Sequence, residues 1–499
     1  MTEYIIVQAG GKGTRLEYLT RNKPKCLVPI NNLPMLFHLF KKFPNSKFII
    51  IGDYHFDVLD EYLKAFAGVQ YLLVRSTGKQ GTLSGIKDAL EFLPKAKPFL
   101  LVWSDLILAE DLNIPNKGRY IGISKDFRCR WSYKDGIFEE EPSFEHGVAG
   151  LFQFENKELL KGVPEEGEFV RWLQSRNLEF DELPMYKSKE YGLLSEYEKL
   201  EPQKCRPFNQ LIVKDKTIIK KAITKQGNEI ADKELAWYRY VQEKSDFNHI
   251  PTIHSYEPFE MEKVIGQNIY ECKEYDEQQK KTILADIIQG LKELHNIEKS
   301  ETDYFSVKEA YFTKTIDRLS KVRDLIPYAN QETITINNRK CRNIFFYKNQ
   351  LEEKVQEFQV LQFEFLHGDC TFSNIMVNDS LKPIFIDPRG YFGYTQLFGD
   401  PDYDWAKLYY SVVGNYDQFN LKRFNLNILD GQVNIEVESN GWEHLETDFF
   451  DLIPNTVSKE KIKLLHAIIW LSLTTYAWED FDSICGAFYL GLYYLEEVL

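Results

Sequence analysis

Residues 365–393, FLHGDCTFSNIMVNDSLKPIFIDPRGYFG, decide the fold class expected for the C-terminal part of the chain. Asp369 precedes Asn374 by five residues, and Asp387 follows Asn374 by thirteen, after the apolar run 383–386. Phosphoryl transfer to a hydroxyl needs a carboxylate that accepts the hydroxyl proton, and oxygen ligands for Mg²⁺. The spacing therefore predicts Asp369 as the base and Asn374 and Asp387 as magnesium ligands. The alternative is a polar loop followed by an Asn-Asp turn and a strand.

The order His-Gly-Asp at 367–369, with Asn374 and Asp387 after it, resembles the aminoglycoside and choline kinase branch of the protein-kinase-like fold. Residues 399–408, GDPDYDWAKL, resemble a second motif of that branch. In that family the last aspartate of this motif hydrogen-bonds the catalytic loop, which implies this role for Asp404. Arg389 lies two residues after Asp387, and we expect it either to contact an anionic group of the substrate or to form a surface salt bridge.

The segment before this stretch carries the other signals of such a kinase. Residues 210–223 predict a β-hairpin that ends in two lysines, and alternation along a strand lets only one of them face ATP. We favour Lys220 over Lys221, with Glu234 on the predicted helix 231–241 as its ion-pair partner. The resemblance further implies that backbone groups of Glu262 and Lys263 meet adenine.

The N-terminal part opens with a buried strand, residues 4–9, which runs directly into the glycine-rich turn 10–15. Glycines allow a backbone to approach a phosphate chain and present its N–H groups. Residues 9–30, AGGKGTRLEYLTRNKPKCLVPI, resemble the nucleotidyltransferases that make nucleotide-linked sugars and nucleotide-linked choline. That resemblance implies a nucleotide-binding loop and two phosphate-binding cations. The implied residues are Gly10, Gly11, Lys12, Gly13 and Thr14 for the loop, with Arg15 and Lys25 as the cations.

Further candidates follow the later strands of this half. Asp105 comes after the predicted strand 99–103, and in the resembled family it would bind Mg²⁺. Gln80, Gly81 and Thr82 precede a predicted helix, 83–92. They are candidates for base recognition, with Thr82 as an ordinary helix cap as the alternative. In the family, Ala149 and Gly150 would let the acceptor lie close to its strand.

The chain departs from that family at one position with a catalytic consequence. Many members carry a second aspartate late in the domain, and residues 186–192, YKSKEYG, contain none. Three interpretations stay open: Glu190 or another carboxylate replaces it, one metal ion suffices, or activity is weak.

These patterns predict an α/β protein of two domains. A Rossmann-like, GT-A-like nucleotidyltransferase sheet is expected over 1–200, and an α+β kinase-like domain over 205–499, with lobes at about 205–265 and 266–499. The charged, proline-containing segment 199–207 predicts a short linker, and residues 299–365 predict a helical segment with a structural role.

Composition excludes several other classes. The formal net charge of −14 makes a nucleic-acid partner unexpected. Seven scattered cysteines without a CxxC pattern predict free thiols. We expect no signal peptide, no membrane insertion and a cytoplasmic location, because the chain starts in a strand and no long apolar window occurs.

The sequence thus predicts a bifunctional enzyme that uses Mg²⁺, ATP and a second nucleoside triphosphate, with CTP or UTP expected. A sugar or polyol is the first choice of acceptor, and the product would feed cell-surface polysaccharide synthesis. Choline or ethanolamine is the alternative, because an aromatic cage would bind such a cation. The rings that would build it, or else fill a helical core, are Trp405, Tyr409, Tyr410, Tyr416, Trp442, Trp470, Tyr476 and Trp478. A second alternative is a binding-only transferase half. No oligomeric state is predicted.

Overall fold

The computed structural model describes residues 2–76, 79–200, 209–223, 225–272 and 274–499. By its internal contacts the chain divides into two compact units. The first comprises Met1–Pro202 with the short segment Trp478–Asp482, and the second comprises Gln203–Ala477 with Ser483–Leu499. Most of the predicted linker, residues 201–207, lies outside the described residues.

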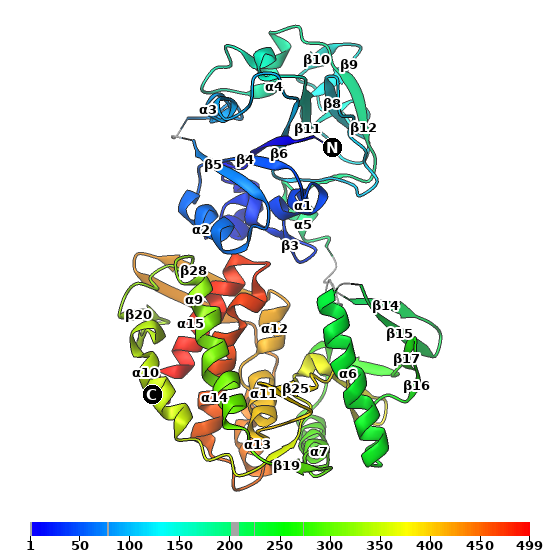
Figure 1. Cartoon of the computed structure of the whole chain (residues 1–499), viewed down its shortest axis with the longest axis vertical. Helices are drawn as coiled ribbons and strands as arrows, with labels where there is room; N and C mark the ends of the chain where they lie inside the picture. The colour runs from blue at the N-terminus through cyan, green and yellow to red at the C-terminus, as the bar shows by residue number, and fades with distance from the viewer. Residues whose placement is uncertain (1, 77–78, 201–208, 224, 273) are drawn as a thin grey trace. The chain divides into compact units, whose positions relative to one another are not determined.

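The first unit is built on a nine-stranded mixed sheet (Figure 1). Its parallel part has the order β6-β1-β4-β5, and β11 joins β6 antiparallel. The strands β1, β4, β6 and β11 are largely buried, as their apolar runs predict, whereas β5 at the edge is partly exposed. The strands are β1 Tyr4–Gln8, β4 Lys47–Gly52, β5 Gln70–Arg75, β6 Phe99–Trp103, β8 Tyr120–Ser124, β9 Ser132–Lys134, β10 Ile137–Glu139, β11 Gly147–Phe154 and β12 Asp181–Met185.

Short helices and two small strand pairs complete this unit. In one of these pairs, β7 directly follows the central strand β6, and β13 pairs with it from much later in the chain. These elements are α1 Met35–Lys42, α2 Phe56–Phe66, α3 Ile86–Glu91, α4 Phe169–Gln174, α5 Leu194–Tyr197, β2 Pro29–Ile30, β3 Leu33–Pro34, β7 Leu106–Ile107 and β13 Lys189–Glu190, with 3-10 turns Thr14–Thr20, Lys25–Leu27 and Lys157–Leu160.

The second unit begins with a four-stranded antiparallel sheet, β14-β15-β17-β16, and the long helix α6 contacts β15 (Figure 1). A three-stranded sheet, β18-β23-β24, also belongs to this unit, and Asp369 and Asn374 shortly precede β23 whereas Asp387 shortly follows β24. The elements are β14 Asn209–Val213, β15 Thr217–Ala222, α6 Lys225–Lys244, β16 Ile253–Tyr256, β17 Phe259–Glu262, β18 Gly266–Asn268, β23 Ile375–Asn378 and β24 Pro383–Phe385.

The remainder of this unit is mainly helical, with α14 packed against α9 and α11. Its helices are α7 Glu277–His295, α8 Tyr304–Lys308, a π-helical turn Glu309–Thr313, α9 Lys314–Val322, α10 Ile344–Gln356, α11 Asp402–Val412, α12 Tyr416–Asn420, α13 Glu446–Leu452, α14 Lys459–Leu473 and α15 Phe481–Leu495, with 3-10 turns Ile269–Glu271, Phe372–Asn374, Glu443–Leu445 and Thr474–Ala477. Its short strands are β19 Lys299–Ser300, β20 Thr333–Ile336, β21 Arg339–Arg342, β22 Phe363–Phe365, β25 Tyr391–Phe392, β26 Thr395–Gln396, β27 Phe398–Gly399, β28 Phe424–Leu429 and β29 Gln432–Val437.

The predicted α/β class is confirmed by this mixture of sheets and helices. None of the described helices combines the length and apolar character that a membrane crossing requires. The six cysteines within the described ranges are free thiols, whereas Cys205 lies outside them.

The expected helix 83–92 was placed too early. The helix α3 begins at Ile86, after Gly85 in the left-handed conformation with φ 78°. Thr82 is therefore not its cap.

Candidate active sites

In the first unit, the glycine-rich turn and Asp105 leave the same edge of the parallel sheet. Gln8, the last residue of β1, pairs with Ile51 on one side and Trp103 on the other. The Ala9 N–H donates to the Ile51 carbonyl at 2.9 Å, and the Ser104 N–H donates to the Gln8 carbonyl at 3.2 Å. This is the carboxyl edge of the strands, where open α/β sheets bind ligands.

Gly13 brings the glycine-rich turn against Lys25. Its φ of 65° favours glycine, and a Cβ there would lie 3.0 Å from the Lys25 Cβ. The turn therefore packs on the aliphatic stem of Lys25, which directs the lysine toward the sheet edge. There the Lys25 ammonium forms an ion pair with the Asp105 carboxylate, and both side chains are largely buried.

Glu190 joins this pair through strand pairing. It lies opposite Leu106 in the β13–β7 pair, and the Tyr191 N–H donates to the Asp105 carbonyl at 3.0 Å. A Cβ on Gly192 would lie 2.7 Å from Glu190 Oε1, 3.3 Å from Arg15 Nη2 and 3.4 Å from Lys25 Nζ, so these side chains meet around one glycine.

The electrostatics of this group follow from its composition. Burial, and next the charge of Asp105, raise the pKa of Glu190 to about 7, although Lys25 and Arg15 oppose the shift. Two carboxylates and two cations thus share one small region. Asp105 and Glu190 are suited to hold Mg²⁺ with substrate phosphate oxygens, since this ion usually takes one or two carboxylates plus phosphates and water.

The predicted base-recognition residues form a turn that is fixed from two sides. The Thr82 hydroxyl accepts a hydrogen bond from the Phe169 N–H at 2.7 Å, and the Gln80 carbonyl accepts one from the Gly167 N–H at 2.8 Å. A side chain on Gly81 would overlap the Gly167 carbonyl. The Gln8 amide donates to the Thr82 carbonyl at 2.9 Å, which ties this turn to the end of β1.

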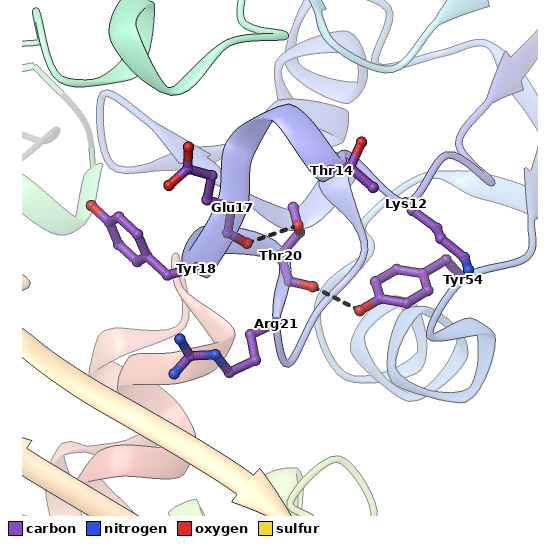
Figure 2. Close-up of a pocket in the computed structure, with 7 residues that line it drawn as sticks. All are labelled: Lys12, Thr14, Glu17, Tyr18, Thr20, Arg21 and Tyr54. Carbon is purple, nitrogen blue, oxygen red and sulfur yellow. Dashed lines mark hydrogen bonds between the residues drawn. The ribbon is translucent and has the colours of Figure 1, made fainter.

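A cavity of about 340 Å³ lies beside the glycine-rich turn, and Figure 2 shows the residues that line it. Lys12 and Thr14, two of the predicted nucleotide-binding residues, line it, whereas Lys25 and Asp105 are not among its lining residues. The Tyr54 hydroxyl donates to the Thr20 carbonyl at 3.1 Å and so closes one side. Its lining residues are Lys12, Thr14, Glu17, Tyr18, Thr20, Arg21 and Tyr54.

The acceptor contact expected at Ala149 and Gly150 stays a prediction, and the ring of Trp103 lies against Gly150 on the side where a Cβ would point. A Cβ on Gly150 would overlap the Trp103 indole, and the glycine has φ 85°. Packing against Trp103 therefore explains why position 150 is a glycine.

In the second unit, Lys220 and not Lys221 pairs with Glu234. The Lys220 ammonium lies 2.9 and 2.7 Å from the two Glu234 oxygens and 2.6 Å from Asp387 Oδ1. Lys221 is exposed, because adjacent residues on β15 face opposite sides. Burial raises the pKa of Glu234 to about 7 in spite of the adjacent lysine. These contacts place β15, α6 and the end of β24 around one ion-pair network.

Asp404 holds the backbone before Asp369. Its carboxylate accepts hydrogen bonds from the His367 N–H at 2.9 Å and the Gly368 N–H at 2.7 Å, and it lies 3.1 Å from His295 Nε2. The carboxylate is completely buried, and these donors compensate its charge. The turn that presents Asp369 is therefore fixed from α11.

Asp369 and Asn374 are adjacent. The Asn374 amide donates to the Asp369 carbonyl at 2.8 Å and to Asp369 Oδ2 at 3.2 Å, and Lys407 Nζ lies 2.9 Å from Asp369 Oδ1. The Ile386 N–H donates to the Asn374 carbonyl at 2.9 Å, which brings Asp387 beside Asn374. Cys370 is buried with a raised pKa, chiefly because of desolvation, so its thiol is unreactive.

The described residues contain no group of three or more His, Cys, Asp or Glu that could hold a metal ion. At Asn374 and Asp387 the donor set is one amide and one carboxylate. This set suits Mg²⁺ only together with phosphate oxygens and water, as for the pair Asp105 and Glu190.

The expected adenine contact of Glu262 and Lys263 is wrong for their N–H groups. The Glu262 N–H donates to the Thr252 carbonyl at 2.8 Å, and the Lys263 N–H donates to the Lys216 carbonyl at 2.9 Å. Both donors are used within the sheet that contains β17, and neither is available to a base.

Arg389 does not form the surface salt bridge considered above. Within the described part of the chain it has no carboxylate at ion-pairing distance, and its Nη1 donates to the Tyr403 hydroxyl at 2.9 Å. Its guanidinium lies 4.9 Å from the centre of the Tyr391 ring.

The aromatic residues near the C-terminus form a core and not an open cage. The Tyr410 ring lies 4.7 Å from the Trp470 ring and 4.3 Å from the Tyr416 ring, measured between centroids. Tyr476 is partly exposed, with 36% of its surface accessible. The buried rings are Trp405, Tyr409, Tyr410, Tyr416, Trp442 and Trp470.

Two family models match the chain. A model described as nucleotidyl transferase matches residues 4–115, and one described as phosphotransferase enzyme family matches residues 228–428.

The curated relatives are matched over only part of their own length. The D-glycero-alpha-D-manno-heptose 1-phosphate guanylyltransferase of Campylobacter jejuni is 34% identical over 92 residues, which are 18% of this chain and 42% of that protein. The bifunctional protein GlmU of Methanocaldococcus jannaschii is 26% identical over 185 residues, 33% of this chain and 43% of that protein. The mannose-1-phosphate guanyltransferase of Saccharomyces cerevisiae is 33% identical over 109 residues, with shares of 20% and 30%. The chain thus spans less than half the length of these relatives.

Two solved structures are similar to part of the chain. The CTP:phosphocholine cytidylyltransferase of Streptococcus pneumoniae has 19% identity and a TM-score of 0.32, with 40% of this chain and 97% of that chain covered. The inositol-1-phosphate CTP transferase of T. maritima has 14% identity and a TM-score of 0.32, with coverages of 39% and 91%.

Proposed function

We propose that this chain, which combines a nucleotidyl transferase domain with a phosphotransferase-family domain, is a bifunctional enzyme of an activation pathway. The phosphotransferase half transfers the γ-phosphoryl group of ATP to a hydroxyl of a small molecule. The transferase half couples the resulting phosphate to a nucleotide from a nucleoside triphosphate and releases pyrophosphate. The observation that carries the proposal is that each unit contains its own group of cations and carboxylates suited to phosphates.

In the phosphotransferase half, Asp369 accepts the proton of the attacking hydroxyl, and Lys220 neutralises phosphate charge while Glu234 orients it. Asn374 and Asp387 would hold Mg²⁺, which neutralises charge on the transferred group when bound. The ion pair between Lys220 and Asp387 supports this assignment, because it brings both groups to the same phosphates.

In the transferase half, an oxygen of the phosphorylated acceptor attacks the α-phosphorus, and Arg15 and Lys25 neutralise the crowded charge. Asp105 and Glu190 would hold Mg²⁺. The position of Glu190 beside Asp105 favours an active transferase over a binding-only domain, since it supplies the second carboxylate that the sequence motif lacks.

A sugar or polyol remains the first choice of acceptor, for cell-surface polysaccharide synthesis. The curated relatives named as sugar-phosphate guanylyltransferases support this choice, and for this reason GTP joins CTP and UTP as a candidate nucleotide. Choline or ethanolamine is disfavoured by the burial of most of the candidate cage rings.

The test is ADP release by the full chain with Mg-ATP and a panel of acceptors, followed by pyrophosphate release with each triphosphate. Asp369→Asn is expected to lower turnover by about 100-fold or more while ATP binding is retained. Asp379→Asn, a change on an exposed turn, serves as the control and is expected to have no effect. Full turnover in Asp369→Asn would refute the assignment of the base.

A further inference from the structure

Lys407 lies beside Asp369 in the second unit, and three further cations, Lys314, Arg318 and Arg389, are close enough to act on one another's charge. We call these four residues the cation cluster. Lys314 and Arg318 lie one turn apart at the start of α9, Lys407 lies on α11, and Arg389 follows β24. Lys407 and Arg389 meet at Tyr403, whose hydroxyl accepts from Arg389 and whose ring centre lies 6.0 Å from Lys407 Nζ.

The cluster has little negative charge to balance it. Lys407 is paired with Asp369 at 2.9 Å. Arg318 Nη1 donates to the Ser472 carbonyl at 2.7 Å and to the Ser472 hydroxyl at 2.9 Å, which are neutral groups. Among the residues that the structure describes, no carboxylate lies within ion-pairing distance of Lys314, Arg318 or Arg389.

The uncompensated charge acts on its neighbours. Burial, and then the charges of Arg389, Arg318 and Lys407, lower the pKa of Lys314 well below its usual value. The charge of Glu309 opposes this shift, and the Glu309 carboxylate accepts a hydrogen bond from the Tyr394 hydroxyl at 3.0 Å. Arg389 is likewise the largest cause of a lowered pKa at Tyr391. The pKa of Arg389 itself is raised, because Tyr403, Tyr391 and Asp369 together outweigh its burial, so the positive potential is felt at Lys314 and Tyr391.

A backbone irregularity lies directly before the cluster. Residues Glu309–Thr313 form a π-helical turn that continues into α9 at Lys314. Such turns are rare and occur frequently at functional sites, because the extra residue re-aims the side chains that follow.

We propose that the cation cluster binds an anionic group of the phosphoryl acceptor, so that the acceptor is a hydroxyl compound carrying a phosphate or a carboxylate. This inference rests on the proposed role of Asp369 as the base. The acceptor oxygen forms a bond to the γ-phosphorus, the bond from that phosphorus to the β,γ-bridging oxygen breaks, ADP leaves, and Asp369 takes the proton. The anionic group would hold the hydroxyl beside Asp369, at a site separate from Lys220, which serves ATP.

The experiment measures ADP release by the full chain with matched acceptors: neutral ribitol and mannose, cationic choline, phosphorylated ribitol 5-phosphate and mannose 6-phosphate, and the carboxylate glucuronate. We expect at least one anionic acceptor to exceed its neutral counterpart about tenfold or more in kcat/KM. The phosphate and carboxylate compounds decide between the two anionic groups.

Variants of the cluster provide the second measurement. Lys314→Met and Arg318→Gln, which remove the charge and keep an unbranched side chain, are expected to raise the KM for the anionic acceptor about tenfold and to leave the KM for ATP unchanged. Lys321→Met, an exposed position on the same helix, is the matched control. Equal kcat/KM for neutral or cationic acceptors, with no change of KM in the cluster variants, would overturn the inference.

If no acceptor gives ADP, the proposed kinase function fails, and the cluster is still tested by anion binding. We then compare the thermal midpoint in sodium phosphate and in sodium chloride of equal ionic strength. The phosphate-dependent rise should persist in Lys220→Met and Lys321→Met and be lost in Lys314→Met and Arg318→Gln. A rise of the same size in all variants, or no rise in the wild type, contradicts the inference.

Discussion

Glu190 lies beside Asp105 because β13 pairs with β7 directly after the central strand β6. The Tyr191 N–H donates to the Asp105 carbonyl at 3.0 Å, and Glu190 pairs with Leu106. Asp105 lies near the middle of the first unit in sequence and Glu190 near its end, and backbone hydrogen bonds hold them together.

The proposed role of this pair predicts graded losses of pyrophosphate release. Asp105→Asn is expected to lower kcat/KM of the transferase about 100-fold or more, and Glu190→Gln about 10- to 100-fold, because each removes a negative ligand oxygen. ADP release by the other half should be unchanged. Glu182→Gln, on an exposed strand position, is the control. Full transferase activity in Glu190→Gln would mean that another group supplies the second contact.

The two adjacent lysines of β15 form a matched pair of variants. Lys220→Met is expected to lower kcat/KM for ATP about 100-fold or more, since it removes the cation beside the phosphates and leaves Glu234 buried without its partner. Lys221→Met changes an exposed side chain and should retain activity. Steady-state ADP release measures both, and similar losses in the two variants would contradict the assignment.

Alanine variants of Gly13 and Gly11 test two different roles of glycine in the same turn, packing and close approach of the ligand. Gly13→Ala is expected to destabilise the first unit by about 1–3 kcal/mol, because φ is 65° and the new Cβ would press on Lys25. Gly11→Ala meets no atom within 4 Å and should leave the thermal midpoint unchanged. A raised KM for the nucleoside triphosphate in Gly11→Ala would support close approach of the phosphates to this turn. Equal thermal midpoints for the two variants would contradict the packing argument.

The burial of His466 should make the stability of the second unit depend on pH. It is buried, its Nε2 accepts from Trp470 Nε1 at 2.9 Å, and desolvation lowers its pKa to about 3. Near pH 6.5 His466 takes up a proton in the unfolded chain, whereas it stays neutral in the folded chain. The free energy of unfolding is therefore highest above pH 6.5 and decreases as the pH falls. Between pH 7 and pH 5, His466 is expected to lower the free energy of unfolding by about 2 kcal/mol.

The measurement for His466 is a difference between proteins. His466→Gln keeps an acceptor for Trp470 and removes the titration, so its stability should fall less steeply with acid. Calorimetry gives the thermal midpoint at each pH. The transition of the second unit is identified as the one that Mg-ATP shifts. Other titrating groups, such as Asp417 with its pKa raised to about 6, contribute equally to both proteins and cancel. Parallel pH profiles would show that His466 is not responsible.

Prediction from sequence worked where a local pattern specifies the backbone. The strands 48–51, 71–74 and 99–103 lie within β4, β5 and β6, because long apolar runs suit a parallel sheet covered on both faces. It was wrong where tertiary contacts compete with the pattern. The segment before Ile86 is fixed by Gly167 and Phe169 and not by a helix. Likewise, the N–H groups of Glu262 and Lys263 are used by neighbouring strands.

The cation cluster could not be predicted from the sequence either. Lys314 and Arg318 lie in a segment expected to be structural, and neither belongs to a motif. Their significance depends on α9 lying near Arg389 and Lys407, more than seventy residues away in sequence.

The sequence by itself determined the two kinds of domain and the residues that its motifs contain: the glycine-rich turn with Lys25, and Asp369 with Asn374 and Asp387. Such motifs are readable because closely spaced residues of fixed type are required at one turn. Only the tertiary structure decided that Glu190 stands beside Asp105, that Lys220 pairs with Glu234, and that Lys314, Arg318 and Arg389 come close to Lys407. Strand pairing and helix packing bring these groups together over long sequence separations, and charge balance is a property of that three-dimensional neighbourhood.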